Sequence, residues 1–288
     1  MMKKTLLTLA ALTASNFASP IDFDQIPAAA QWYLHADVDA VRTTEIGEEL
    51  KALVEQEAGK ELKAMTRIFA FDPMEDLAAV TLFGEGDNAV VLIHGEFDRA
   101  HLVDVIGGAD EHEVSDYQGF QVHSWDDKGK TQHGVFVKAD LLAISEKTKH
   151  LKHALDVFAG VKEPMGKGDA EGAPLMFGLA NLSKMEIEDE DMEIFKEAKS
   201  VTMRMDEAEE AMIATLKIST DDAKLAKRMS RMVDGLLAMV EGSIPAIDDY
   251  GLESEVAQGD DKTKVVATVK MPSKHLVGLL EYLQTLKE

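Results

Sequence analysis

Residues 78–97 read AAVTLFGEGDNAVVLIHGEF, and this stretch decides how the rest of the chain is interpreted. Two apolar runs, Ala78 to Gly84 and Ala89 to Phe97, flank the polar, glycine-containing segment from Glu85 to Asn88. Apolar runs separated by such a short segment are typical of a β-hairpin. Asp98 follows directly and suits the N-cap of a helix over residues 99–106. The stretch therefore predicts strand, turn, strand and helix in that order.

The same order recurs in the second half of the chain. Ser200–Met205 and Ala211–Ile218 predict a second hairpin, and Thr220 or Asp221 caps a long helix that ends at Glu241. The remaining predicted strands are Gln31–Asp37, Gly119–Trp125, Thr131–Ile144, Leu175–Ala180, Leu252–Gln258 and Lys264–Met271. The remaining predicted helices are Thr44–Gly59, Leu62–Phe69, one that starts at Ser145 or Thr148 and ends near Phe158, Asp189–Ala198 and Ser273–Leu286. Both halves then read β-α-β-β-α-β-β-α. We expect an α+β fold of two similar units, each a largely antiparallel sheet with helices packed on one face.

A segment rich in glycine and proline separates the two units. It runs from Glu163 to Gly172 and reads EPMGKGDAEG. Such composition favours a linker over a helix or strand. The predicted organisation is a first α+β unit over residues 24–162, a linker over 163–172 and a second α+β unit over 173–288.

The N-terminus has the pattern of a signal peptide. Lys3 and Lys4 precede an apolar run of about 11 residues, which is too short to cross a bilayer as a helix. Thr13 and Ser15 suit the −3 and −1 positions of a cleavage site, and Ala18 is a second candidate for −1. We therefore predict a signal peptide within residues 1–18, and export to the bacterial periplasm or the cell exterior.

Composition excludes several classes of function. The chain of 288 residues is 45% hydrophobic, enough to fill a core, and its formal net charge is −23. Such a charge disfavours nucleic acid and anionic membrane surfaces as partners. The absence of cysteine removes disulfides, thiolate nucleophiles and Cys-ligated metal sites. Neither a Gly-x-Ser-x-Gly elbow nor a nucleotide-binding glycine motif occurs, and no segment after residue 18 is apolar enough to anchor in a membrane.

Two histidines have the spacing of a metal site on a helix. His150 and His153 lie three residues apart and can share one helix face. Lysines at 147, 149 and 152 surround them and oppose a cation. We favour an exposed helix face over a metal site.

Further histidines lie in predicted strands. His94 is expected to be packed or exposed at an edge. His123 and His133 are expected to pair across a hairpin beside Trp125, through packing rather than metal binding.

Acidic clusters raise the alternative of divalent-cation binding. Residues 186–193 carry six carboxylates in eight residues, but they lack the glycine that a calcium loop uses to turn. An acidic helix start explains the run, because carboxylates there favour the helix dipole. The aspartate pairs at 126–127, 248–249 and 260–261 have the pattern of turns.

The long helix over residues 221–241 carries a wide apolar stripe. It consists of Leu225, Met229, Met232, Val233, Leu236, Met239 and Val240. We interpret the stripe as a core that packs on the sheet. An adaptable groove for a hydrophobic peptide or lipid, or a dimer contact, remains the alternative.

One phrase carries a family resemblance. Residues 71–81 read FDPMEDLAAVT, and the following hairpin ends at Gly95-Glu96-Phe97-Asp98. Over about residues 30–160 the chain resembles a group of exported bacterial proteins of unknown function. The resemblance implies a secreted, duplicated α+β architecture and no particular activity. The second half lacks the phrase.

We therefore predict an exported, soluble, non-enzymatic protein that acts by binding or scaffolding. The alternatives are a secreted cofactor-independent hydrolase and divalent-cation binding through the acidic surface. A protein, a peptide or a small apolar ligand is the expected partner, without nucleic acid and without stable membrane insertion, and a homodimer is left open. The sequence singles out no catalytic, cofactor-binding or metal-binding residue and no cofactor.

Overall fold

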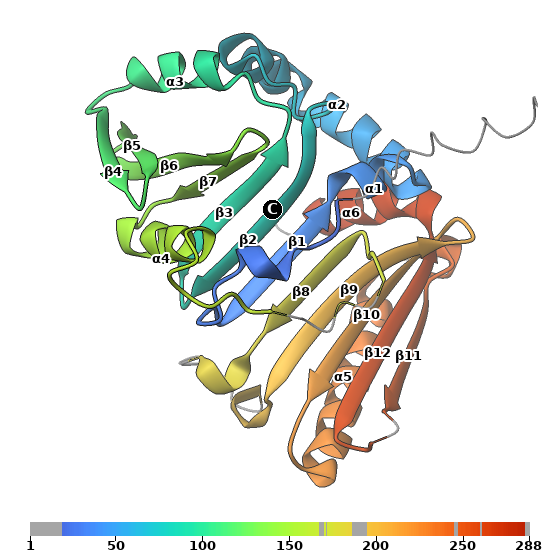
Figure 1. Cartoon of the computed structure of the whole chain (residues 1–288). Helices are drawn as coiled ribbons and strands as arrows, with labels where there is room; N and C mark the ends of the chain where they lie inside the picture. Colours follow the sequence, from blue (N-terminus) through green and yellow to red (C-terminus); the bar gives the residue numbers. More distant parts are fainter. Residues whose placement is uncertain are drawn as a thin grey trace, which may run out of the picture.

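A computed structural model describes residues 19–166, 170, 172–185, 195–244, 247–259 and 261–285. These residues form one twelve-stranded sheet in which all neighbouring strands are antiparallel, in the order β11-β12-β10-β9-β8-β1-β2-β3-β7-β6-β5-β4 (Figure 1). The chain is thus a mixed α+β fold with a large antiparallel sheet. The predicted signal peptide lies outside the described residues.

The first half of the chain supplies seven strands. They are β1 (Trp32–Asp37), β2 (Leu77–Glu85), β3 (Asn88–Gly95), β4 (Glu113–Tyr117), β5 (Phe120–Asp127), β6 (Lys130–Lys138) and β7 (Leu141–Ser145). Its helices are η1 (Phe23–Gln25), α1 (Val38–Arg42), α2 (Glu45–Phe69), α3 (Arg99–Gly107) and α4 (Thr148–Phe158).

The second half supplies the remaining strands. They are β8 (Met176–Ala180), β9 (Ser200–Ala208), β10 (Ala211–Ser219), β11 (Glu253–Gln258) and β12 (Lys264–Pro272). Its helices are η2 (Leu182–Lys184), α5 (Ala223–Ser243), η4 (Ile247–Tyr250), η5 (Ser273–His275) and α6 (Leu276–Thr285). Most of the helix predicted over Asp189–Ala198 lies outside the described residues.

Both predicted hairpins are confirmed. The pairing of β2 with β3 begins next to the turn, where Glu85 lies opposite Asn88. Gly86 in the turn has a positive φ of 54°, which suits glycine. β9 pairs with β10 along their full length.

The two halves join into one continuous sheet. β1 pairs with β8, with Tyr33 opposite Leu179. Glu207 of β9 also reaches the first half, because its carboxylate accepts hydrogen bonds from the amides of Glu45 and Ile46 at 2.9 and 2.8 Å. A carboxylate is favourable there, since the first amides of a helix have no partner within the helix. The start of the predicted linker is also paired, because Met165 donates its amide to the Ile26 carbonyl at 2.6 Å.

The identical order predicted for the two halves is not found. The predicted strand Thr131–Ile144 is two strands, β6 and β7, and the predicted order lacks β4. β4 is a polar edge strand, largely exposed, so it has no apolar run by which a sequence reveals a strand. Within the described residues, the first half therefore has two strands more than the second.

Helix α2 is longer than predicted. It continues through Gly59 and spans 25 residues in all, from Glu45 to Phe69, and its C-cap Ala70 has a left-handed φ of 49°. The predicted stop at Gly59 was wrong, because a glycine inside a helix costs only about 1 kcal/mol and the apolar positions continue to Phe69. Thr44 caps the start as predicted and accepts a hydrogen bond from the Gly47 amide at 3.1 Å.

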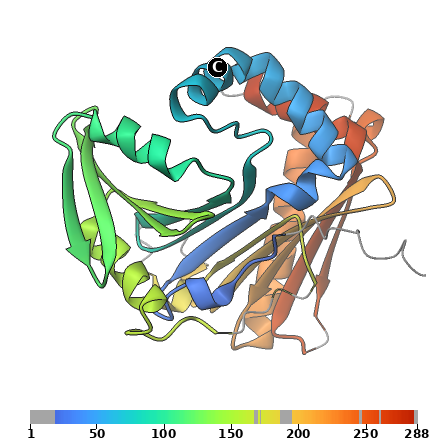
Figure 2. The same ribbon diagram turned by 45° about the horizontal axis from the view of Figure 1, so that its top comes forward.

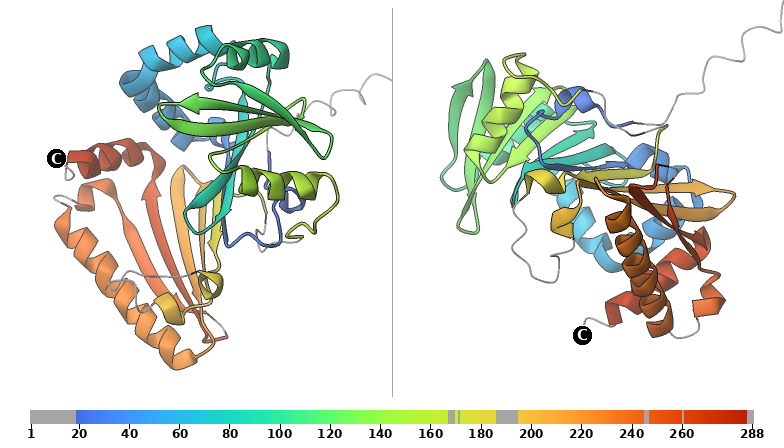
Figure 3. Two further views of the ribbon diagram at one scale, coloured as in Figure 1. Left: turned by 90° about the vertical axis from the view of Figure 1, so that its left-hand side faces the viewer. Right: turned by 90° about the horizontal axis from the view of Figure 1, so that it is seen from below.

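The helices do not all lie on one face of the sheet. Residues directly opposite each other in antiparallel strands share a face. One such row is Leu34, Gly178, Met203, Leu216 and Ala267. Ala267 packs in the cluster under α5, whereas Tyr33, the neighbour of Leu34, packs in the cluster under α4. Helices α4 and α5 therefore cover opposite faces (Figure 3). Within the first half, Leu92 packs under α4 whereas its neighbour Ile93 faces α3, so the prediction of helices on one face was wrong for this half.

Three apolar clusters hold the fold together. The first lies between α4, η1 and the strands of the first half, the second lies under α5, and the third joins α2 and α6 to β10 and β12. Figure 2 shows α2 and α6 side by side over the second half of the sheet. In the part of the chain that is described, no helix is both long enough and apolar enough to cross a membrane.

Candidate functional site: an apolar hollow under helix α3

A hollow of about 560 Å³ lies between α3 and the sheet, on the face opposite α4. Helix α4 packs directly on β3, β6 and β7, whereas α3 contacts the end of α2 and roofs the hollow. The sheet side is lined by Ile93, Trp125, Gly134, Phe136, Leu142 and Ile144, and the other walls by Met65, Phe69, Phe71, Phe97, Leu102, Val105, Ile106 and Ala109. Every one of these residues is apolar.

Strand alternation explains why the sheet side of the hollow is apolar. Leu92 points into the buried cluster under α4, and Ile93 therefore points into the hollow. In β7, Leu141 likewise points into the cluster under α4, and Leu142 points into the hollow. A strand that is apolar on both faces needs cover on both, and α3 covers this one incompletely.

Local hydrogen bonds hold α3 in place. Asp98 caps the helix, because its carboxylate accepts from the His101 amide at 3.0 Å. The His101 ring donates from Nε2 to the Ile68 carbonyl at 2.8 Å. This bond connects the first turn of α3 to the last turn of α2, so the roof of the hollow is attached at its α2 end.

Stacked aromatic rings form one wall. Phe71 stacks on Phe97 with ring centroids 5.1 Å apart, and Phe97 meets Phe136 edge-on at 5.8 Å. The Arg99 guanidinium lies 5.4 Å from the centroid of the Phe136 ring. Such contacts each contribute about 0.5–1.5 kcal/mol beyond burial, so this wall is preorganised.

Trp125 lies over Gly134 on the sheet side. A Cβ on Gly134 would lie 3.1 Å from both Cη2 and Cζ3 of the indole. Only glycine therefore leaves the indole its present place in the hollow.

Two aspartates at the end of β5 are the charged residues of the lining. They are Asp126 and Asp127. The Asp126 carboxylate accepts from the Gly129 amide at 2.9 Å within the β5–β6 turn, as its sequence pattern predicts. Elsewhere, Asp248 and Asp249 lie in η4, and Asp261 accepts from the Thr263 amide at 3.1 Å, while Asp260 lies outside the described residues.

The predicted pairing of His123 with His133 is wrong. The register places His123 opposite Gly134 and Ser124 opposite His133, so the two rings project from opposite faces. A one-residue difference in register moves a side chain to the other face.

His123 pairs instead with His112. His123 Nδ1 lies 3.1 Å from His112 Nε2 on the face of the hollow. Burial lowers the pKa of His123, and the nearby His112 and Arg99 lower this pKa further. The neutral ring is therefore the favoured form of His123 in the folded chain.

His133 lies on the other face, under α4. Its Nδ1 is 2.7 Å from the Ser124 hydroxyl and its Nε2 is 2.8 Å from the Thr148 hydroxyl. Burial lowers its pKa, and the Lys152 charge adds to this effect. Neither His133 nor its two partners, Ser124 and Thr148, lines the apolar hollow.

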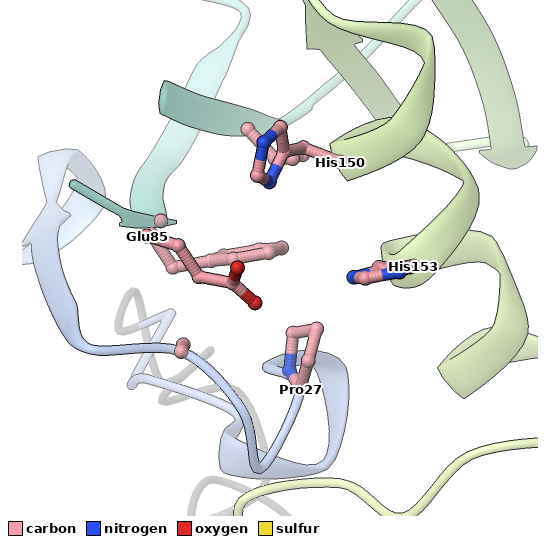
Figure 4. A pocket seen from close by; sticks show the side chains of 8 residues that line it. Pro27, Glu85, His150 and His153 are labelled. Carbon is pink, nitrogen blue, oxygen red and sulfur yellow. The ribbon is translucent and has the colours of Figure 1, made fainter. Parts of the chain in front are cut away.

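His150 and His153 line a separate small hollow of about 20 Å³, together with Glu85 and Pro27. Figure 4 shows both imidazoles and the Glu85 carboxylate directed into this space. Both histidines are half-buried rather than on an exposed face, because α4 packs against β3. The volume suits about one water. Within the described ranges no three His, Asp or Glu side chains are placed to hold a metal ion.

Two further sequence candidates have different outcomes. His94 is half-buried, with its Nε2 3.1 Å from Gln25 Oε1, and burial lowers its pKa. The acidic run at 186–193 lies outside the described residues, so calcium binding there stays a hypothesis.

The apolar stripe of α5 is only partly core. Leu225, Met229 and Val233 are buried against the sheet, whereas Leu236 and Met239 are 46% and 65% exposed. The stripe therefore extends beyond the strands that it covers.

Comparison with known proteins identifies a similar fold but assigns no activity. No protein-family model matches the sequence, and no curated protein matches it significantly. Among solved structures, crystal form III of TP0453 aligns with a TM-score of 0.53 at 10% identity, over 91% of this chain and 98% of that one. Crystal forms IV and I of TP0453 align with TM-scores of 0.49 and 0.47 at 9% and 8% identity. The likeness to form III shows a shared overall fold.

Proposed function

We propose that this chain is an exported, non-enzymatic binding protein that holds one small apolar molecule in the hollow under α3. The observation that carries the proposal is the hollow itself, whose volume of about 560 Å³ is lined almost entirely by apolar side chains. Sites for small molecules are typically about 300–1,000 Å³ and largely apolar, with a few polar groups that orient the ligand. The aromatic wall is formed before a ligand binds, which reduces the entropic cost of binding.

The lining favours binding over catalysis. A hydrolase needs a nucleophile and a base that converge on one space. Among the described residues, no serine, threonine or histidine lines the hollow, and Ser124 and His133 face the other side of the sheet. The hydrolase alternative gains no support from this site.

The negative charge of the protein at the hollow restricts which polar group a ligand can carry. Asp126 and Asp127 line the hollow, and the whole chain carries a formal charge of −23. A fatty-acid carboxylate would be repelled by both, whereas a neutral or cationic polar end would not. We therefore propose an apolar body with a neutral or cationic end.

We also propose that the two halves arose by duplication. Outward from the β1–β8 pair, the order is β1-β2-β3-β7-β6 on one side and β8-β9-β10-β12-β11 on the other. Each side thus runs first, second, third, last and last-but-one strand of its half, once the β4–β5 hairpin is set aside. The lysine pair and short apolar run at the N-terminus support export.

A neutral naphthylamine dye tests the binding site. We expect saturable binding of one dye per chain, detected as dye fluorescence and as energy transfer from Trp125 in a Trp32→Phe background. Ala109→Phe fills part of the hollow and should weaken binding about tenfold, a loss of roughly 1.4 kcal/mol. Ala100→Phe adds the same side chain on the exposed side of α3 and is the matched control. Equal affinities of the two variants would contradict the proposed site.

A further inference from the structure

Ser19 is held by three side chains at the start of the described chain. Its backbone amide donates to Asp37 Oδ2 at 2.8 Å, and its carbonyl accepts from His35 Nε2 at 2.9 Å. Its hydroxyl lies 3.3 Å from Asp39 Oδ2. Every polar group of this residue therefore has a partner on β1 or α1.

The carboxylate that receives the Ser19 amide is fully buried. Asp37 is 0% exposed, and its other oxygen caps α1 by accepting from the Ala40 amide at 2.9 Å. Over the described ranges no ion pair involves Asp37. Arg42 ion-pairs with Asp39 instead, and it also donates to the Met74 carbonyl. A buried carboxylate without a cation is costly, because amide hydrogen bonds only partly replace its hydration.

His35 does not supply the missing charge. Its Nε2 carries a hydrogen, since the Ser19 carbonyl can only accept, and its Nδ1 then accepts from the Thr81 hydroxyl at 2.9 Å. Burial lowers the pKa of His35 and outweighs the opposing effects of the Ser19 carbonyl and Asp37. The ring is thus neutral at pH 7, and the group that faces Asp37 is the nitrogen of Ser19.

We infer that a signal peptidase hydrolyses the bond between Ala18 and Ser19, and that the freed α-ammonium of Ser19 becomes the counter-ion of Asp37. Water adds across that peptide bond, which leaves a carboxylate on Ala18 and an amine on Ser19 that takes up a proton. The amide hydrogen bond of 2.8 Å then becomes a partly buried ion pair with the same partner. A residue as small as Ala18 suits the −1 position of such a site.

Cleavage after Ser15 would not have this effect. The chain would then begin at Asn16, and the Ser19 nitrogen would stay a neutral amide. The ion pair therefore distinguishes two sites that the sequence leaves open, and processing at the second of them completes the native electrostatics around Asp37.

The first experiment measures the mature mass. The inference rests on the proposed export, so the full 288-residue chain is expressed in a bacterium, and the protein released from the periplasm is analysed by intact mass spectrometry and amine labelling. We expect the mass of residues 19–288 with a labelled Ser19. A chain that keeps residues 1–18 would contradict export, whereas a chain that starts at Asn16 would contradict only this inference.

The second experiment measures the ion pair. Thermal midpoints of chains 19–288 and 16–288 are compared between about pH 6 and pH 10. An α-amine has an ordinary pKa of about 8, and pairing with Asp37 raises this pKa in the folded state. The chain that begins at Ser19 should therefore be the more stable one below about pH 8 and should lose this advantage as pH rises through the raised value.

Asp37→Asn is the variant that separates charge from capping. Asparagine keeps an oxygen for the cap of α1 but removes the negative charge. The difference between the two chain lengths should vanish in Asp37→Asn and persist in Asp24→Asn, which removes an exposed charge from η1 nearby. Equal midpoints of the two unmutated chains across the pH range would overturn the inference even if Asp37→Asn does not fold.

Discussion

The Nε2 of His101 lies 2.8 Å from the carbonyl oxygen of Ile68, so the first turn of α3 hydrogen-bonds to the last turn of α2. This bond joins the two helices that wall the apolar hollow. Because α3 rests on the sheet less closely than α4 does, the bond matters more for the position of α3 than an exposed hydrogen bond usually would.

Loss of this bond should loosen α3 alone. We predict that His101→Ala lowers the free energy of unfolding by about 1 kcal/mol, the typical net value of one hydrogen bond. Amide hydrogen exchange should accelerate over Arg99–Gly107 and stay unchanged over Thr148–Phe158. Unchanged exchange in α3 would show that Leu102 and its neighbours, rather than His101, hold the helix.

Gly134→Ala should displace the indole of Trp125. The added Cβ would lie 3.1 Å from two ring atoms, closer than normal contact, and overpacking of this kind costs about 1–3 kcal/mol. The emission of Trp125 in a Trp32→Phe background should shift to longer wavelength as the ring moves toward water. Gly107→Ala, whose Cβ would meet no atom within 4 Å, is the control and should leave the emission unchanged.

Gly59→Ala should stabilise the chain. Gly59 lies inside α2 and is half-buried, and a Cβ at this position would meet no atom within 4 Å. Alanine should therefore raise the free energy of unfolding by about 0.5–1 kcal/mol. Gly86→Ala should do the opposite, because Gly86 has a φ of 54° in the β2–β3 turn. Urea denaturation midpoints measure both changes. A neutral or destabilising Gly59→Ala would indicate two separate helices in place of α2.

Stability should fall as the pH drops from about 6.5 toward 5. Burial lowers the pKa of five histidines, which are His35, His94, His123, His133 and His153. A histidine whose pKa is lower when folded favours the folded state fully above its unfolded value of about 6.5 and loses this effect as pH falls through the folded value.

Urea midpoints at about pH 5, 6 and 7.5 test this prediction. The midpoint should be lowest at pH 5, and the decrease should be smaller in His35→Gln, which removes one buried titrating ring. A midpoint that does not change between pH 7.5 and pH 5 would contradict it.

The sequence predicts individual helices, strands and turns better than it predicts how they pair and pack. The hairpin around Gly86 and the cap at Thr44 follow from local rules, and both are confirmed. β4 could not be predicted because an exposed edge strand has no apolar pattern. The pairing of His123 with His133 failed by one residue of register, which only the turn geometry determines.

The hollow itself is beyond the reach of sequence patterns. Its lining comes from two helices, four strands and the segments between them, and Met65 and Trp125 lie 60 positions apart in the chain. Each apolar side chain has the pattern of an ordinary core residue, because nothing local records that α3 covers the sheet incompletely. The contact of Ser19 with Asp37 is likewise hidden, since it depends on where the chain enters the fold.

The central strand of the sheet has a consequence for the order of folding. β1 pairs with β2 on one edge and with β8 on the other, and β8 begins at Met176, about 140 residues later in the chain. Until that segment has been synthesised, β1 offers an unpaired edge that other strands can join, and such edges promote aggregation. The first half therefore cannot reach its final state alone. A chaperone that keeps the nascent chain extended would protect this edge during the interval before β8 is available.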